Sequence, residues 1–296
     1  MLNQVKIITD SNSGLLQQEA EELGIFVIPM PFTINGKEYL EEITLSQEEF
    51  YQLLLEDTNI STSQPSQYYL ETLWKEQLKE NESIVYIPMS SGLSATCESA
   101  LALAEKFDGR VQVVDNLRIS VTQKESVYEA IELAKRGKSA LEIKTYLEET
   151  KHKSSIYIML ETLKYLKKGG RIKPAAAALA TMLQIKPILF SRGDKFDKFS
   201  TTLTTVHGKR KMIQKIREEL ATDFLDDYEK GNMVVSVAHT NNLAAALKFK
   251  EEIIAAFPKL TFRFVDALSL SVTCHIGPGS LAIAITVNNY LNTKIE

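Results

Sequence analysis

The sequence predicts an α/β fold, built as two α/β domains with mostly parallel sheets. Nine short segments rich in apolar and β-branched residues recur along the chain, and most are too continuously apolar for strands with one face in water. Segments with helical patterns lie between them, and such alternation is typical of a largely parallel sheet. The expected strands cover residues 5–9, 26–32, 84–88, 111–114, 155–159, 186–190, 233–238, 260–265 and 281–287.

Two of the intervening helices begin with a recognisable start signal. Ser46 is followed three residues later by Glu49, and Ser139 is followed by Glu142. Both pairs match the capping box, in which the two side chains bond N–H groups that the start of a helix leaves unpaired. We therefore expect helices to begin at these two serines.

The length of 296 residues favours two domains, because single hydrophobic cores stop growing at roughly 250 to 300 residues. The polar segment 151–154 follows two consecutive helical patterns, and polar segments commonly separate domains. We place the boundary there, which predicts an N-terminal α/β domain at residues 1–153 and a C-terminal α/β domain at residues 154–296.

The composition argues against several classes of protein. Lys and Arg total 34 against 38 Asp and Glu, so a formal charge of −4 offers no electrostatic footprint for nucleic acid. The two cysteines, Cys97 and Cys274, lack the paired spacing of a zinc site or a disulfide framework, and we expect no metal. No apolar run approaches the ~20 residues that a bilayer span needs, and the N-terminus lacks a signal-peptide pattern. We expect a cytoplasmic protein.

Polar loops follow or flank several of the expected strands. In open α/β sheets, ligands bind beyond the carboxyl ends of strands, where loops and helix N-termini meet. Hydroxyls, glycines and an imidazole are dense in these loops, and such neutral donors can hold an anion. The candidate segments are 10–13 (Asp-Ser-Asn-Ser), 61–65 (Ser-Thr-Ser-Gln-Pro), 90–96 (Ser-Ser-Gly-Leu-Ser-Ala-Thr) and 275–279 (His-Ile-Gly-Pro-Gly).

Each of these loops also has a purely structural interpretation. Thr62 and Ser66 are suited to capping the helix that follows them, and Ser94 is suited to capping a helix over residues 95–106. His275 stands close to two glycines and is suited to a turn in which its ring bonds the backbone. The sequence leaves both interpretations open.

The common nucleotide-binding motifs are absent from the sequence. Neither G-x-G-x-x-G after a strand nor G-x-x-x-x-G-K-[ST] occurs. Segment 168–171 (Lys-Gly-Gly-Arg) contains a glycine pair with neither spacing, which is typical of a helix C-cap with a basic flank. We therefore expect that the chain does not bind ATP itself and uses no cofactor.

Six segments, taken in order, resemble the DegV family of bacterial proteins. Together they span residues 8 to 279, and several short motifs in the right order are more specific than a single glycine motif. The segments are 8–11 (Ile-Thr-Asp-Ser), 62–66 (Thr-Ser-Gln-Pro-Ser), 90–96, 166–172 (Leu-Lys-Lys-Gly-Gly-Arg-Ile), 185–189 (Ile-Lys-Pro-Ile-Leu) and 275–279.

The resemblance implies two α/β domains related to the substrate-binding fold of dihydroxyacetone kinase, with a lipid tunnel between and within them. It implies a carrier without catalytic activity that binds one long-chain fatty acid, such as palmitate or oleate. Family members of this type present the carboxylate to the ATP-binding subunit of fatty acid kinase, which forms an acyl phosphate for lipid metabolism. Carried over motif by motif, Thr62, Ser94 and His275 contact the carboxylate, and Arg171 belongs to the surface that meets the kinase.

The sequence departs from the family pattern in two places. Residues 113–116 are Val-Val-Asp-Asn where the family usually has Val-Val-Asp-Ser, and residues 117–120 (Leu-Arg-Ile-Ser) replace a Gly-rich continuation. Ala95 stands where glycine is common. Because these residues lie near the expected tunnel, we expect them to influence which acyl chain fits.

Three alternatives to a carrier stay open. Ser94, Asp115 or Asp266, and His275 follow the Ser, Asp, His order of α/β-hydrolases, which would make the chain a serine hydrolase of acyl esters. Segment 92–96, however, lacks the final glycine of G-x-S-x-G, which permits the sharp turn at the nucleophile. The second alternative is small-molecule binding through a histidine, as in the substrate-binding part of dihydroxyacetone kinase. The third is a regulatory or structural role, in which the loops only cap helices.

Overall fold

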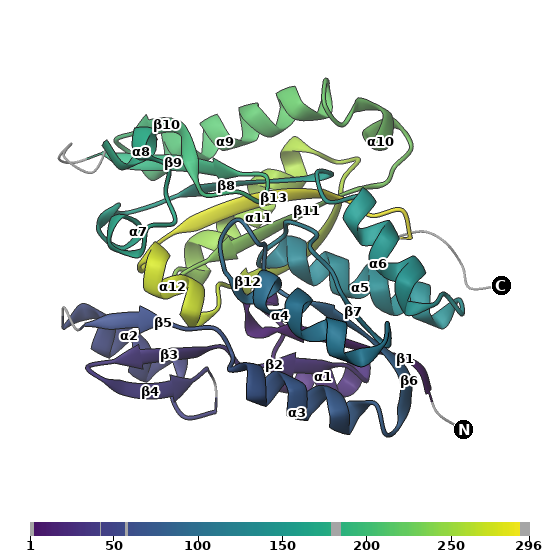
Figure 1. Ribbon diagram of the computed structural model, residues 1–296. Coiled ribbons are helices and arrows are strands. Elements are labelled where there is room, and N and C mark those ends of the chain that lie inside the picture. The colour runs from purple at the N-terminus through teal and green to yellow at the C-terminus, as the bar shows by residue number, and fades with distance from the viewer. Residues whose placement is uncertain (1–2, 42, 57–58, 179–184, 291–296) are drawn as a thin grey trace.

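The computed structural model describes residues 3–41, 43–56, 59–178 and 185–290. Figure 1 shows the N-terminal half of the chain, in purple and blue, below the second half, in green and yellow. Each half contains a main sheet with helices packed against it, which confirms the predicted α/β fold. No helix within the described ranges is long and apolar enough to cross a membrane.

The first main sheet is parallel throughout, as the sequence predicts. Its strands, in spatial order, are β2 (Phe26–Ile28), β1 (Asn3–Asp10), β6 (Asn81–Ile87) and β7 (Val111–Val113). The short helices η1 (Ser11–Ser13) and η2 (Glu105–Phe107) follow β1 and precede β7. One face is covered by α1 (Gln17–Leu23), α5 (Val121–Lys135) and α6 (Ala140–Glu149), and the other by α3 (Gln67–Gln77) and α4 (Thr96–Ala104). Burial on both faces explains why these strands lack a polar alternation.

The second main sheet has six strands and is mostly antiparallel, so the prediction of mostly parallel sheets is wrong for this half of the chain. Only one pair of neighbouring strands is parallel. In spatial order the strands are β10 (Asp197–Thr202), β9 (Lys186–Ser191), β8 (Ser154–Met159), β13 (Leu281–Val287), β11 (Met233–His239) and β12 (Thr261–Ala267). Continuous apolar runs indicate burial on both faces, but they do not specify direction, which the connections decide.

Helices bury both faces of this second sheet. One face packs against α9 (Thr205–Leu220) and α11 (Leu243–Ala256). The other face is turned toward the first half of the chain and packs with residues of α7 (Lys164–Gly169), α8 (Pro174–Ala177) and α12 (Leu270–Ile276). The remaining helix, α10 (Leu225–Glu229), follows α9 (Figure 1). The cavity described below lies on the side of the sheet that carries α7 and α12.

The single strand predicted at residues 26–32 is wrong, because the chain leaves the first sheet after β2. The next strand, β3 (Pro31–Ile34), pairs with β4 (Lys37–Leu40) and β5 (Ile60–Thr62) in a small antiparallel sheet beside α2 (Gln47–Leu55). Pro29 and Pro31 lack the N–H group that a continuous ladder would need. Asn35 and Gly36, both with positive φ, form the turn between β3 and β4, a signal that the sequence already contained.

Both predicted capping boxes are confirmed. The Ser46 hydroxyl accepts the N–H of Glu49, whose carboxylate in turn accepts the N–H of Ser46 at 3.0 Å. Ser139 and Glu142 form the same pair of bonds. Local side-chain signals therefore set where α2 and α6 begin.

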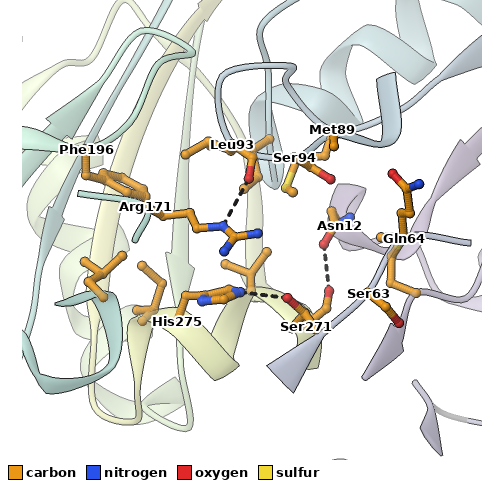
Figure 2. Close-up of a pocket in the computed structure, with 17 residues that line it drawn as sticks. Asn12, Ser63, Gln64, Met89, Leu93, Ser94, Arg171, Phe196, Ser271 and His275 are labelled. Atoms are coloured by element: carbon orange, nitrogen blue, oxygen red, sulfur yellow. Dashed lines mark hydrogen bonds between the residues drawn. The ribbon is translucent and has the colours of Figure 1, made fainter. Parts of the chain in front are cut away.

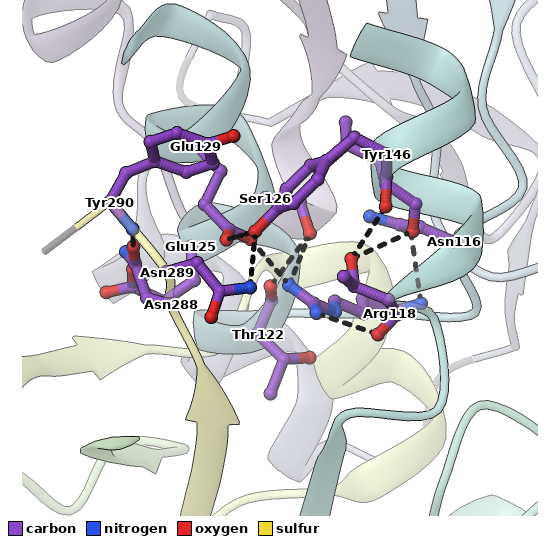
Figure 3. A network of polar contacts seen from close by, with 12 residues as sticks. Asn116, Arg118, Thr122, Glu125, Ser126, Glu129, Tyr146, Asn288, Asn289 and Tyr290 are labelled. Atoms are coloured by element: carbon purple, nitrogen blue, oxygen red, sulfur yellow. Dashed lines mark hydrogen bonds and ion pairs between the residues drawn. The ribbon is translucent and has the colours of Figure 1, made fainter. Parts of the chain in front are cut away.

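Buried polar groups fasten the two halves of the chain together around α5. Lys124 of this helix pairs with Glu19 and with Asp266, both at 3.0 Å, so one cation holds carboxylates from both halves. Figure 3 shows a second network beside it, in which Arg118 and Glu129 form an ion pair at 3.3 Å with both side chains fully buried. The loop that carries Arg118 is thus held by a buried ion pair with α5. The domain boundary predicted at residue 153 falls just before β8 and stays a prediction.

Candidate functional site

A cavity of about 380 Å³ lies between the two halves of the chain. Thr62, Ser94, Arg171 and His275, the four residues that the sequence singled out, all line it. They come from the end of β5, the loop before α4, the segment after α7, and α12. The other described lining residues are Asn12, Met30, Ser63, Gln64, Met89, Leu93, Ala95, Ile119, Leu166, Phe196, Ser271, Val272 and Ile276.

The cavity is polar toward one side and apolar toward the other. Figure 2 shows Ser63 and Gln64 on the side opposite Phe196, with Arg171, Ser94 and Asn12 between them. Beyond Phe196 lies a second void of about 20 Å³ that shares four residues with the first. Its lining is Ile119, Ser120, Val121, Ile156, Ile158, Phe196, Ala238, Leu268, Val272, Ile276, Ala282 and Ala284.

His275 stands at the polar side and is held by a residue 213 positions away in sequence. Its Nε2 atom forms a hydrogen bond of 2.9 Å with the hydroxyl of Thr62. Burial, reinforced by the positive charge of Arg171, lowers the pKa of His275 from 6.5 to about 4. The imidazole is therefore neutral near pH 7 and acts there as a hydrogen-bonding group without charge.

The capping interpretation is correct for Ser66 and wrong for Thr62. The Ser66 hydroxyl accepts the N–H of Tyr69 at 3.2 Å and so caps α3. Thr62 ends β5, where it pairs with Phe32, and its hydroxyl is directed to His275. The side chain of Thr62 is therefore part of the cavity wall and not of a helix cap.

Ser94 combines both interpretations. Helix α4 begins at Thr96 and its N-cap residue is Ala95, which provides no side-chain bond. The Ser94 hydroxyl accepts the N–H of Thr96 at 3.2 Å and lies 2.9 Å from the Thr96 hydroxyl. Ser94 thus satisfies one N–H group at the helix start while its side chain lines the cavity.

Arg171 is half-buried in the cavity wall. Its Nε atom donates to the carbonyl of Leu93 at 3.3 Å (Figure 2). Its Nη1 atom donates to the carbonyl of Gly169. The guanidinium therefore links the segment after α7 to the loop that carries Ser94. The assignment of Arg171 to a surface that meets a partner stays a prediction. The structure adds that its positively charged guanidinium lies beside the polar side of the cavity.

Sequence reasoning did not single out four polar residues of the lining, which are Asn12, Ser63, Gln64 and Ser271. The Oδ1 atom of Asn12 accepts the hydroxyl of Ser271 at 2.7 Å, and its Nδ2 atom donates to the buried carboxylate of Asp10 at 2.9 Å. Asn12 lay inside a candidate loop, but Ser271 lay outside every one. Since Ser271 and His275 are four residues apart, helical spacing was the signal that could have joined them.

Comparisons with known proteins identify the family. A family model described as an uncharacterised protein of the DegV family matches residues 4–288. The chain belongs to the DegV family. Protein DegV of Bacillus subtilis is 31% identical over 284 residues, which make up 94% of this chain and 98% of that protein. The resemblance drawn from the six sequence segments is thereby confirmed.

Two solved DegV structures share the fold of this chain. The crystal structure of DegV from Bacillus subtilis, a fatty acid binding protein, has a TM-score of 0.82 at 29% identity and covers 96% of this chain and 99% of that one. A fatty-acid-binding DegV family protein from Thermus thermophilus has the same TM-score at 27% identity and the same coverage. Lipid binding is thus described for relatives that match this DegV chain along almost its whole length.

The contacts of this DegV chain do not assemble the hydrolase triad. Asp115 accepts the hydroxyl of Ser91 at 2.7 Å, and Asp266 pairs with Lys124 at 3.0 Å. Within the described residues, no hydrogen bond or ion pair joins either carboxylate to His275. The imidazole therefore lacks the carboxylate that orients the base in such a triad.

Proposed function

We propose that this DegV-family chain binds one long-chain fatty acid, such as palmitate or oleate, with the carboxylate at Thr62, Ser94 and His275. The observation that carries the proposal is a cavity with hydrogen-bonding groups toward one side and an apolar lining toward the other. This distribution matches a ligand with one charged end and a long hydrocarbon tail. The fatty acid binding described for the relatives supports it.

The apolar tail would provide most of the binding free energy. A sixteen-carbon acid has about fourteen methylene groups, and burial at ~0.8 kcal/mol each amounts to about 11 kcal/mol before ordering and association costs. Phe196, Ile119 and Val272 line both the main cavity and the small void beyond it. We therefore place the distal end of the tail among these residues.

The polar groups would orient the ligand. Thr62 and His275 are already hydrogen-bonded to each other, and the half-buried guanidinium of Arg171 adds a positive charge near them. Hydrogen bonds to a charged acceptor contribute about 1.5 to 3 kcal/mol each, which is less than the whole tail but enough to select which end lies where. A neutral imidazole can form a hydrogen bond with the carboxylate at physiological pH without a change of its own charge.

We propose in addition that the chain has no catalytic activity of its own and presents the bound carboxylate to the ATP-binding subunit of a fatty acid kinase. Ser63 and Gln64, which line the polar side, are exposed, so the head group would lie close to solvent. This proposal derives from the family resemblance, and Arg171 is the residue that we assign to the encounter with the kinase.

Lipid content tests the first proposal. We expect protein purified from bacterial cells to release about one fatty acid per chain on organic extraction, as mass spectrometry would show. We expect no esterase activity and no labelling of Ser94 by a fluorophosphonate, because the described contacts of the Ser94 hydroxyl are with Thr96 and include no base to activate it. Protein that carries no lipid and takes up neither palmitate nor oleate would refute the carrier, and an adduct on Ser94 would favour the hydrolase.

Head-group variants test the presentation of the carboxylate. Thr62→Ala, Ser94→Ala and His275→Ala should keep the lipid, because the tail is unchanged, but should slow acyl phosphate formation with the kinase subunit about 10²-fold through misplacement of the carboxylate. Thr145→Ala is the matched control, because it removes an exposed hydroxyl on α6 that bonds only Leu141 in the described contacts. Unchanged kinetics in all three site variants would contradict the assignment.

A further inference from the structure

The two glycines at the end of α7 are required for different reasons. Gly170 has a positive φ of 68° and closes the helix with its N–H bonded to the carbonyl of Leu166. A Cβ there would meet no atom within 4 Å. Gly169 has no positive φ, but a Cβ there would lie 2.9 Å from Cε1 of His275 and closer still to Nδ1. Residue 170 therefore requires glycine because of its backbone conformation, whereas residue 169 requires glycine because the imidazole occupies the space of a side chain.

A second contact between a ring and a glycine joins the same two helices. Here the ring belongs to α7 and the glycine follows α12. Gly277, just after α12, would bring a Cβ within 2.6 Å of Cε2 of Tyr165, which lies on α7. The backbone of each segment thus packs against a ring of the other segment. The imidazole of His275 packs against Gly169, and the phenol ring of Tyr165 packs against Gly277. Two such contacts leave the end of α12 little freedom to move relative to α7.

The peptide group of Gly169 also connects His275 to the opposite wall of the cavity. Its carbonyl accepts a hydrogen bond from Nη1 of Arg171, and Nε of the same guanidinium donates to the carbonyl of Leu93. Leu93 directly precedes Ser94. A continuous set of contacts therefore runs from the imidazole through Gly169 and Arg171 to the loop that carries Ser94.

We propose that Gly169 is a positioning residue for the polar side of the cavity, which holds the His275 imidazole against Thr62 and sets its spacing from Ser94 through Arg171. The consequence for the carboxylate rests on the proposed function, whereas the contacts themselves do not. A methyl group at residue 169 has to displace the ring, and displacement of the ring breaks its bond to Thr62.

A double-mutant cycle on lipid-free protein tests the contact. Gly169→Ala should lower Tm when His275 is present and should have little effect in a His275→Ala background, because the methyl group then occupies the space of the ring. Gly170→Ala is the matched control, since its cost comes from the positive φ and should be the same with and without the imidazole. A Gly169→Ala variant that unfolds, with a double variant that folds, also supports the proposal. A double variant as unstable as the single one overturns it.

The titration of His275 provides a readout that a purely structural glycine would not change. NMR of the ring protons, assigned by comparison with His275→Gln, should give a pKa near 4 in the wild type and in Gly170→Ala. In Gly169→Ala the pKa should move toward 6.5, because the displaced ring gains solvent and leaves Arg171. A wild-type titration in Gly169→Ala refutes the positioning role. Neither readout involves lipid, so failure of the lipid-binding proposal would appear separately, as absence of bound fatty acid in the wild type.

Discussion

Replacement of His275 by glutamine should change how the free energy of unfolding depends on pH. The folded protein holds the imidazole neutral, because burial and Arg171 lower its pKa from 6.5 to about 4. The unfolded chain takes up a proton below about pH 6.5, whereas the folded chain does so only near pH 4. Protonation of His275 therefore favours unfolding progressively as the pH falls through this window, and above pH 6.5 the group contributes no such penalty.

The size of the effect follows from the two pKa values. At pH 4.5 the penalty amounts to about 2.5 kcal/mol, and at pH 7.5 it is close to zero. His275→Gln keeps a side chain that can bond Thr62 but removes the titrating group. The variant should therefore gain about 2.5 kcal/mol relative to the wild type between pH 7.5 and pH 4.5.

Urea denaturation of both proteins at the two pH values measures this change, since all other titrating groups are shared and cancel in the comparison. His207→Gln is a suitable control for the replacement of an imidazole by an amide, because His207 is exposed on α9 and does not line the cavity. A His275→Gln variant that follows the wild type at both pH values would show that the imidazole titrates normally. The lowered pKa that we assign to His275 would then be incorrect.

Two further predictions concern the loop that carries Arg118 and the small void beyond Phe196, where we place the distal end of the tail. Arg118→Leu leaves the buried Glu129 without its cation and should lower the free energy of unfolding by about 3 to 5 kcal/mol. Lys138→Ala, which breaks an exposed pair with Glu142, should lower the free energy of unfolding far less, and equal losses in urea denaturation would contradict the reasoning. Ala284→Leu adds three carbons beside a void of about 20 Å³ and should shift binding toward shorter fatty acids, and an unchanged preference between fourteen- and eighteen-carbon acids in competition would refute it.

Much of the site could be predicted from short segments, because each candidate loop contains its own signal. Thr62, Ser94 and His275 lie in separate candidate loops and were assigned through the family resemblance, and the structure places all three around one cavity. The loop at residues 116–120, where the sequence departs from the family pattern, contributes Ile119 to the lining. Ser271 was missed because its role depends on Asn12, a residue 259 positions away.

The sequence by itself determined the elements whose causes lie within a few residues. The capping boxes at Ser46 and Ser139 bond backbone groups three residues away, and continuous apolar segments report burial on both faces of a sheet. Family membership likewise follows from short motifs in order. Such properties are local, so they can be recognised before the fold is known.

Only the tertiary structure decided the direction of the strands in the second sheet and the geometry of the cavity. A strand buried on both faces has the same composition in either direction, so its orientation depends on where the connecting segments let it return. The contact of His275 with Thr62, and the space that Gly169 leaves for the imidazole, depend on how α7, α12 and β5 pack. Packing joins residues far apart in the chain, and no pattern of neighbouring residues specifies those distances.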